Sequence, residues 1–146
     1  MNNRFKARGR FQLKVVDAYT REVVQEVDEE NLVVTSGMVL LSQLLGGSAS
    51  GSQVTTISVG TNATAPQATD TAITGAFSKA IDSATYADTG SVTFNFTLDV
   101  GDANGMTIAE CGLFSASGAL FARKTPNPIT KTDAVKLIGT WTIQFV

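Results

Sequence analysis

The sequence predicts an all-β fold, an antiparallel sandwich or jelly-roll-like domain with one short helix. Apolar and polar residues alternate from Val92 to Val100 and again from Val135 to Phe145, which is the two-residue period of a half-buried strand. Turn-forming residues recur about every ten residues, a spacing typical of sandwiches and jelly rolls. A helical pattern occurs in one short segment, Met38–Leu45. We therefore expect about eight strands and little helix.

The first part of the chain predicts a β-hairpin. Residues 11–15 alternate between apolar and polar side chains, and residues 23–27 predict the strand that returns. Residues 17–21 are mostly polar and predict the turn between them. The acidic run at residues 28–30 follows, and we expect it to be a solvated loop. Its alternative role is to bind a basic partner.

A short helix is expected next, from Met38 to Leu45. This prediction rests on the spacing of Met38, Leu41 and Leu45, which places them on one helical face. Thr35 or Ser36 can cap the first turn. The two glycines after Leu45 end the helix, because glycine readily adopts the left-handed conformation found at helix ends.

The second half of the chain predicts most of the sheet. Strands are expected at residues 56–60, 91–100, 107–114, 120–123 and 135–145. Polar loops are expected at residues 61–71, 101–105 and 125–133, and residues 77–86 fit either a strand or irregular structure. The expected core consists of apolar residues from two of these strands: Phe94, Phe96, Leu98, Leu137, Trp141 and Ile143.

We expect two parts: a basic extended N-terminal arm at residues 1–10 and a single β-sandwich domain at residues 11–146. Four basic residues alternate with other residues along the arm: Arg4, Lys6, Arg8 and Arg10. An extended chain places all four on one side, and we expect them at a subunit interface, docked on a neighbouring chain. A solvated terminus and phosphate binding are the alternatives. Removal of the arm is expected to leave the fold intact.

Composition narrows the possible partners and locations. The chain has 146 residues, enough for one domain with a real core, and a formal net charge of −2. This charge gives no general attraction to nucleic acid or to an acidic membrane. The longest apolar cluster is too short to span a bilayer, and the first residues lack the apolar run of a secretory signal. We therefore expect no membrane partner, no nucleic-acid partner, and synthesis in a cytoplasm before assembly elsewhere.

The residues needed for most catalytic chemistry are missing. The sequence has no histidine and one cysteine. Ser-His and Cys-His nucleophile systems are therefore excluded, and one cysteine is too few for a zinc site. There is no glycine-rich phosphate or dinucleotide motif, and no pair of acids lies in a context typical of glycosidases. We expect no enzymatic activity, no catalytic residue, no cofactor and no metal.

Three polar or reactive features remain to be weighed. Asp99, Asp102 and Asn104 lie among glycines and could hold a hard cation, but their spacing fits no EF-hand, so a hairpin turn is favoured. Cys111 is expected to be a small buried hydrophobe rather than a reactive thiol. Glu110 is expected to face solvent or a neighbouring chain rather than to act in catalysis.

One segment suggests a protein class. Residues 107–123 combine a strand, a tight polar turn and a second strand, with Glu110-Cys111-Gly112-Leu113-Phe114 before the turn and Leu120-Phe121-Ala122-Arg123 after it. Other motifs accompany it in order, at residues 9–16, 31–37, 57–61, 65–66, 69–73 and 138–143. From Arg10 onward, this order resembles small structural proteins of tailed-bacteriophage virions.

The resemblance implies a non-enzymatic structural virion protein. Fibre proteins are usually longer and carry repeats or coiled coils, so the resemblance favours a capsid cement or decoration protein that bridges and stabilises major capsid subunits. A tail, collar or baseplate/fibre component is the alternative. The implied partners are the major capsid protein or other virion subunits, and copies of the chain itself in a homo-oligomer. A carbohydrate-binding jelly-roll module is a further alternative, but it should expose aromatic side chains as a platform.

Overall fold

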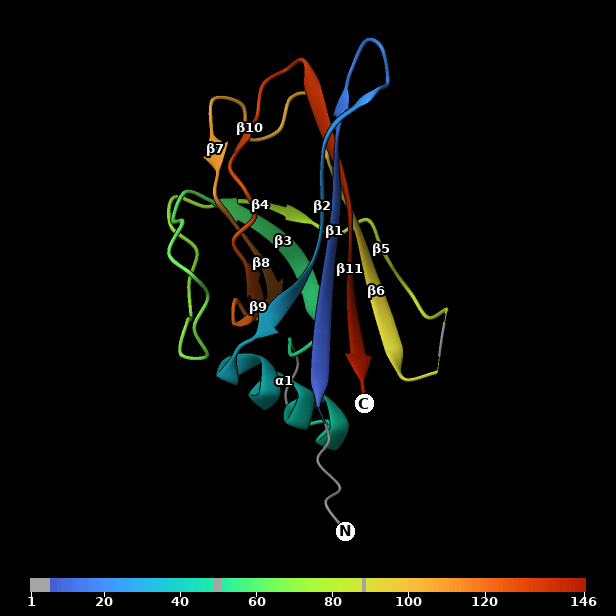
Figure 1. Ribbon diagram of the computed structural model, residues 1–146. Coiled ribbons are helices and arrows are strands. Elements are labelled where there is room, and N and C mark those ends of the chain that lie inside the picture. Colours follow the sequence, from blue (N-terminus) through green and yellow to red (C-terminus); the bar gives the residue numbers. More distant parts are fainter. Residues whose placement is uncertain (1–5, 49–50, 88) are drawn as a thin grey trace.

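The computed structural model describes residues 6–48, 51–87 and 89–146. Its strands are β1 (Ala7–Asp17), β2 (Val23–Val33), β3 (Val54–Gly60), β4 (Phe77–Ala80), β5 (Ser83–Thr85), β6 (Ser91–Leu98), β7 (Thr107–Ile108), β8 (Glu110–Ser115), β9 (Leu120–Lys124), β10 (Ile129–Thr130) and β11 (Val135–Phe145). Among the described residues there is one helix, α1 (Thr35–Gly46), which lies across one end of the strands (Figure 1). The predicted all-β class with one short helix is confirmed.

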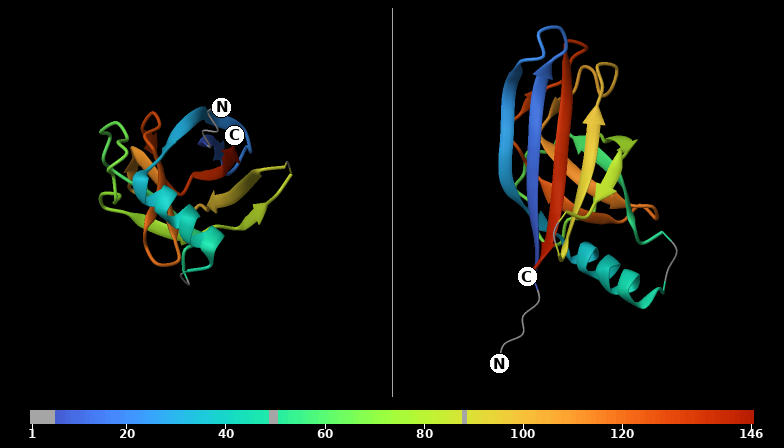
Figure 2. Two further views of the ribbon diagram at one scale, coloured as in Figure 1. Left: turned by 90° about the horizontal axis from the view of Figure 1, so that it is seen from below. Right: turned by 90° about the vertical axis from the view of Figure 1, so that its right-hand side faces the viewer.

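Nine strands form one curled antiparallel sheet in the order β4-β3-β8-β9-β2-β1-β11-β6-β5, and β10 pairs with β7 separately. The two ends of the large sheet are consecutive in the chain, because β4 leads directly into β5. At this corner the Ile81 amide donates to the Thr55 carbonyl at 3.0 Å, and the Asp82 amide donates to the Asn95 carbonyl at 2.7 Å. These bonds connect the corner to β3 on one side and to β6 on the other, so the sheet curls back on itself (Figure 2).

The first strand begins four residues earlier than the sequence predicted. Residues 7–10 pair with the last strand, from Ala7 opposite Phe145 to Arg10 opposite Thr142. These four residues of the predicted arm therefore belong to the sheet. Removing residues 1–10 would delete part of β1, so we no longer expect that deletion to leave the fold intact.

The acidic run at residues 28–30 is part of a strand and not the predicted loop. It lies in β2 opposite β1, with Asp28 facing Gln12 and Glu30 facing Arg10 across the ladder. The physical reason is the neighbouring strand: basic side chains on the outer face of β1 offset the repulsion among the acids.

The six predicted core residues are all buried, which confirms the predicted core. At its centre the Phe11 and Trp141 rings meet edge to face, with their centroids 4.9 Å apart. The Phe11 and Phe96 rings stack at 6.1 Å. The Phe96 ring lies over Gly139, where an added Cβ would come within 2.2 Å of the ring. Glycine at 139 thus makes room for the aromatic ring on the adjacent strand.

The start of α1 differs from the prediction, whereas its end agrees with it. Val34 is the N-cap residue, and no side chain caps the helix. Instead of capping, the Ser36 hydroxyl donates to the Leu120 carbonyl at 2.5 Å. Gly47 ends the helix with a φ of 63°, in the left-handed region that favours glycine.

The residues on which the helix prediction rests are not the ones that α1 buries. Gly37 and Leu40 are the buried helix residues, whereas Met38 and Leu45 are exposed. A Cβ at position 37 would lie 2.2 Å from the Phe121 carbonyl oxygen, so the helix approaches β9 on its glycine side. No helix in the described part of the chain has the length and hydropathy to cross a lipid bilayer.

Candidate functional site

The predicted interface residues separate into three groups. Arg8 and Arg10 lie exposed on the outer face of β1, and Lys6 is exposed just before it, with its amide donating to the Val146 carbonyl at 2.7 Å. Arg4 lies outside the described residues. The structure therefore places three of the four basic residues along one extended segment.

Arg10 is engaged within the chain. Its Nε and Nη2 donate to the two carboxylate oxygens of Asp28 at 2.8 and 2.9 Å. These bonds raise the pKa of Arg10 and lower the pKa of Asp28. By contrast, the side chains of Lys6 and Arg8 have no hydrogen bond or ion pair with any described residue. Lys6 and Arg8 are thus the basic residues left available to a partner.

The outer edge of β2 is unpaired over most of its length. Residues 23–31 pair with β1 on one side, but β9 meets β2 only at Leu32 and Val33. In the described part of the chain, the remaining edge is contacted by a side-chain bond from Gln25 Nε2 to the Pro128 carbonyl at 3.5 Å and an ion pair from Lys124 to Glu29. A free edge presents unpaired backbone donors and acceptors to another chain.

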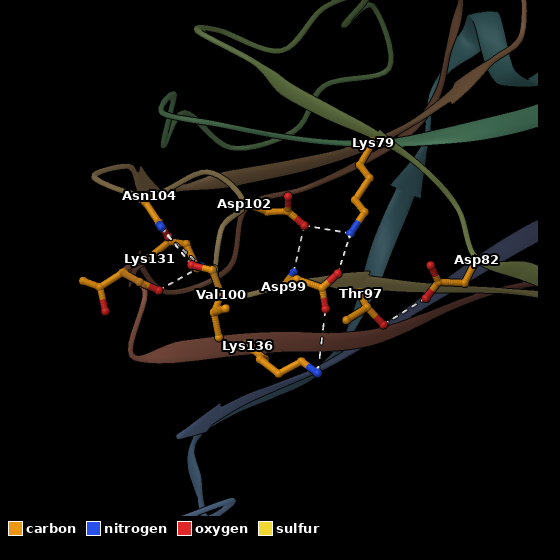
Figure 3. Close-up of polar contacts among 10 residues, drawn as sticks. Lys79, Asp82, Thr97, Asp99, Val100, Asp102, Asn104, Lys131 and Lys136 are labelled. Atoms are coloured by element: carbon orange, nitrogen blue, oxygen red, sulfur yellow. Dashed lines mark hydrogen bonds and ion pairs between the residues drawn. The ribbon is translucent and has the colours of Figure 1, made fainter. Parts of the chain in front are cut away.

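The candidate cation loop contains its own positive charge. The Lys79 ammonium lies 2.7 Å from Asp102 Oδ2 and 3.1 Å from Asp99 Oδ2, and Asp102 also accepts from the Asp99 amide (Figure 3). The hydrogen bond between Lys79 and Asp102 raises the pKa of Lys79 and lowers that of Asp102. Among the described residues, no three His, Cys, Asp or Glu side chains are grouped so as to hold a metal ion. The favoured interpretation, a polar turn, fits this arrangement.

A second lysine supports the same turn from the other side. Lys131 is buried, and its ammonium donates to Asn104 Oδ1 at 2.9 Å and to the Thr132 carbonyl at 2.8 Å (Figure 3). Burial lowers the pKa of Lys131. Asn104 in turn donates to the Val100 carbonyl at 2.8 Å. The sequence pattern indicates the acids of this turn but neither lysine: Lys79 lies within residues 77–86, which fit either a strand or irregular structure, and Lys131 lies in the expected loop at residues 125–133.

We expected Glu110 to face solvent or a neighbouring chain, but the structure places it inside the protein. It is fully buried, and its Oε2 accepts from Arg123 Nη2 at 2.6 Å. Its Oε1 accepts from the Thr74 amide at 2.5 Å. Arg123 also contacts Asp70 Oδ2 at 2.9 Å and the Asn62 carbonyl at 3.1 Å. This buried cluster fastens the loop at residues 61–75 to β8 and β9, which is a structural arrangement.

Cys111 is buried in the core, as predicted. Burial, with a smaller effect from the Glu110 charge, raises the pKa of its thiol to about 12. The thiolate is the reactive form of cysteine, so a thiol with this pKa is a poor nucleophile at neutral pH.

Alkaline pH is expected to destabilise the protein partly through Cys111. The thiol keeps its proton to a higher pH in the folded protein than in the unfolded chain, where its pKa is near 9.0. Its contribution to stability is therefore complete below about pH 9 and decreases as the pH rises toward about 12. Melting temperatures across this range should decline more steeply for the wild type than for Cys111→Ala. Parallel declines would contradict the shifted pKa.

No known protein family, curated protein or solved structure matches this chain. The arrangement of its described residues offers a free strand edge, exposed basic side chains and two internal ion clusters. A free strand edge and exposed basic side chains are features through which one chain can associate with another.

Proposed function

We propose that this chain is a non-enzymatic structural protein of a tailed-bacteriophage virion, and that it acts as a capsid cement or decoration protein that bridges and stabilises major capsid subunits. The order of its sequence motifs suggests the class. The observation that carries the proposal is the unpaired edge of β2 between residues 23 and 30. A cement protein needs a surface for association, and a free strand edge can accept an extended segment of a neighbouring subunit.

The charged end of β1 gives this attachment a second contact. Lys6 and Arg8 are exposed, and Arg8 immediately precedes the residues of β1 that pair with β2. Paired backbone groups and charge-assisted bonds to an acidic subunit would act together. Each contact can be weak, because many copies on one shell multiply the effect. Arg4, Lys6, Arg8 and Arg10 therefore remain the interface candidates, with Lys6 and Arg8 the best placed.

The double substitution Lys6→Gln and Arg8→Gln should weaken attachment to particles without lowering the melting temperature. Both side chains are exposed and make no bond with a described residue, so their loss removes charge and little internal contact. Cosedimentation with particles depleted of the protein measures attachment, and the difference from the wild type should shrink at high salt. Arg21→Gln, in the turn between β1 and β2, is the matched control. Equal attachment of the double variant and the wild type would exclude this role.

The location of the protein tests the proposal directly. Mass spectrometry of purified virions, followed by separate analysis of heads and tails, should find the chain in the head fraction in many copies. Its presence in tails alone would favour the alternative of a tail, collar or baseplate component. Its absence from both fractions would refute a structural role in the virion.

A further inference from the structure

The helix α1 carries no charged residue, and large apolar side chains occur on its exposed side as well as on its buried side. It buries Gly37 and Leu40 against the sheet. On its outer side Met38 is 41% exposed, Val39 50% and Leu45 93%. A helix that is hydrophobic all round is normally buried. The outer side of α1 therefore has the composition of a contact surface.

An apolar groove of about 820 Å³ adjoins this helix. Leu41 and Leu44 of α1 form one wall. The rest of the lining comes largely from apolar side chains of the sheet and of nearby segments: Val54, Tyr86, Val92, Phe121, Ile143 and Phe145. None of the described residues that line the groove is charged. Residues of α1 form both a wall of the groove and the exposed outer side of the helix, and we call the groove and this outer side together the helix patch.

We propose that the helix patch is the interface at which two copies of this chain associate, with the two α1 helices packed against each other and each covering the groove of the other copy. This inference rests on the proposed function, in which copies of the chain assemble on one particle. It adds the surface through which a pair of copies forms.

The exposed side chains of the helix patch supply most of the area that a specific dimer interface requires. Met38, Val39, Leu44, Leu45 and Tyr86 are 41%, 50%, 45%, 93% and 76% exposed. At about 100–200 Å² for a fully exposed large side chain, they present roughly 400 Å². This lies within the range of about 300–600 Å² for the largest apolar patch of a monomer, which is often functional. Two copies would bury about 800 Å² from these side chains alone, and burial of the groove walls must supply the remainder of the roughly 1,000 Å² of a specific interface.

A second copy fits the helix patch better than it fits the other free surface of the chain. A twofold dimer uses the same patch on both copies, so the patch must be complementary to itself. The helix patch meets this condition, because an exposed Leu45 and an apolar groove lie on the same helix and none of the described lining residues is charged. The edge of β2 carries the acidic residues 28–30, which would repel the same residues of a second copy.

Sedimentation equilibrium on the full chain tests the interface with Leu45→Asp. The wild type should be a dimer, and the variant should dissociate at least about 100-fold more readily because a carboxylate would have to be desolvated in the contact. Leu45 is almost fully exposed, so the melting temperature should stay within a few degrees of the wild type. Tyr19→Asp is the matched control: Tyr19 is 83% exposed in the hairpin turn at the opposite end of the sheet, and its replacement should leave the dimer intact (Figure 1).

Cross-linking gives a second readout. Ser42 is exposed on the outer side of α1 between Met38 and Leu45, and Cys111 is buried. Under mild oxidation Ser42→Cys should form a disulfide-linked dimer, since two such residues meet where the helices cross, whereas Tyr19→Cys should not.

The outcomes separate this interface from the proposed function. A wild type that stays monomeric yet binds particles would overturn the interface and keep the function. A chain that dimerises through the helix patch but is absent from particles would keep the interface and refute the function. Unchanged dimerisation of Leu45→Asp would also overturn the interface.

Discussion

Replacement of Arg123 by alanine should lower the free energy of unfolding by about 3–5 kcal/mol. The guanidinium is buried and pairs with the fully buried Glu110, so its removal leaves an uncompensated carboxylate inside the protein. The same substitution removes the contacts to Asp70 and to the Asn62 carbonyl. Urea unfolding, followed by the fluorescence of the single tryptophan, Trp141, measures the loss.

A paired substitution separates the lone charge from the lost packing. Glu110→Leu combined with Arg123→Met removes both charges and keeps much of the volume, so it should cost less than Arg123→Ala alone. Limited proteolysis adds a local readout: cleavage within residues 61–75 should increase in both variants, because Arg123 and Glu110 fasten that loop. A loss below about 1 kcal/mol for Arg123→Ala would show that the ion pair contributes little to stability.

Period-two alternation predicted the strands whose inner positions carry large apolar side chains. Phe94, Phe96 and Leu98 in β6 are examples, and all three are buried. The start of β1 lacked this signal. Its inward position there is Gly9, which is buried but has no side chain, and a Cβ at that position would lie within 2 Å of Asn31 Oδ1. The basic residues on either side of Gly9 therefore dominated the sequence pattern, and residues 7–10 were assigned to the basic N-terminal arm instead of to a strand.

The buried acid was missed because its cover comes from a distant segment. Cys111 and Leu113 point into the core, so the alternation of β8 correctly turns Glu110 away from it. The loop at residues 61–75, which has no periodicity, then covers the outer face of the sheet. The only local indication of the Glu110–Arg123 pair was the register of the β8–β9 hairpin. It pairs Gly112 with Arg123 and so places the guanidinium near Glu110.

The helix shows the opposite case, in which apolar residues were present but did not identify the buried face. Because large apolar residues occur on both the exposed and the buried side of α1, several faces satisfied the helical period. The close approach of Gly37 to the Phe121 carbonyl determines which face packs. Tertiary packing of this kind leaves no periodic trace in the sequence, and it leaves Met38 and Leu45 exposed in the helix patch.

The substitution Phe96→Ala is expected to cost about 3–5 kcal/mol. The ring is buried, stacks on Phe11 and fills the space above Gly139. Removal of the ring loses the favourable free energy of transferring it from water to the core, and it leaves a cavity. The backbones on either side are held in register by the β6–β11 ladder and cannot collapse into that cavity. Tyr19→Ala, at an exposed aromatic in the turn between β1 and β2, should change stability by less than about 0.5 kcal/mol and serves as the control.

A double-mutant cycle with Gly139 tests whether ring and glycine are complementary in size. A Cβ at position 139 would lie 2.2 Å from Phe96 Cζ, so Gly139→Ala alone should destabilise the protein by about 1–3 kcal/mol through overpacking. Phe96→Leu shortens the side chain and makes room for the added methyl group. The combined variant should therefore be more stable than the sum of the two single losses predicts, by about 0.5–3 kcal/mol. Strictly additive losses would mean that the ring does not occupy the space that glycine leaves.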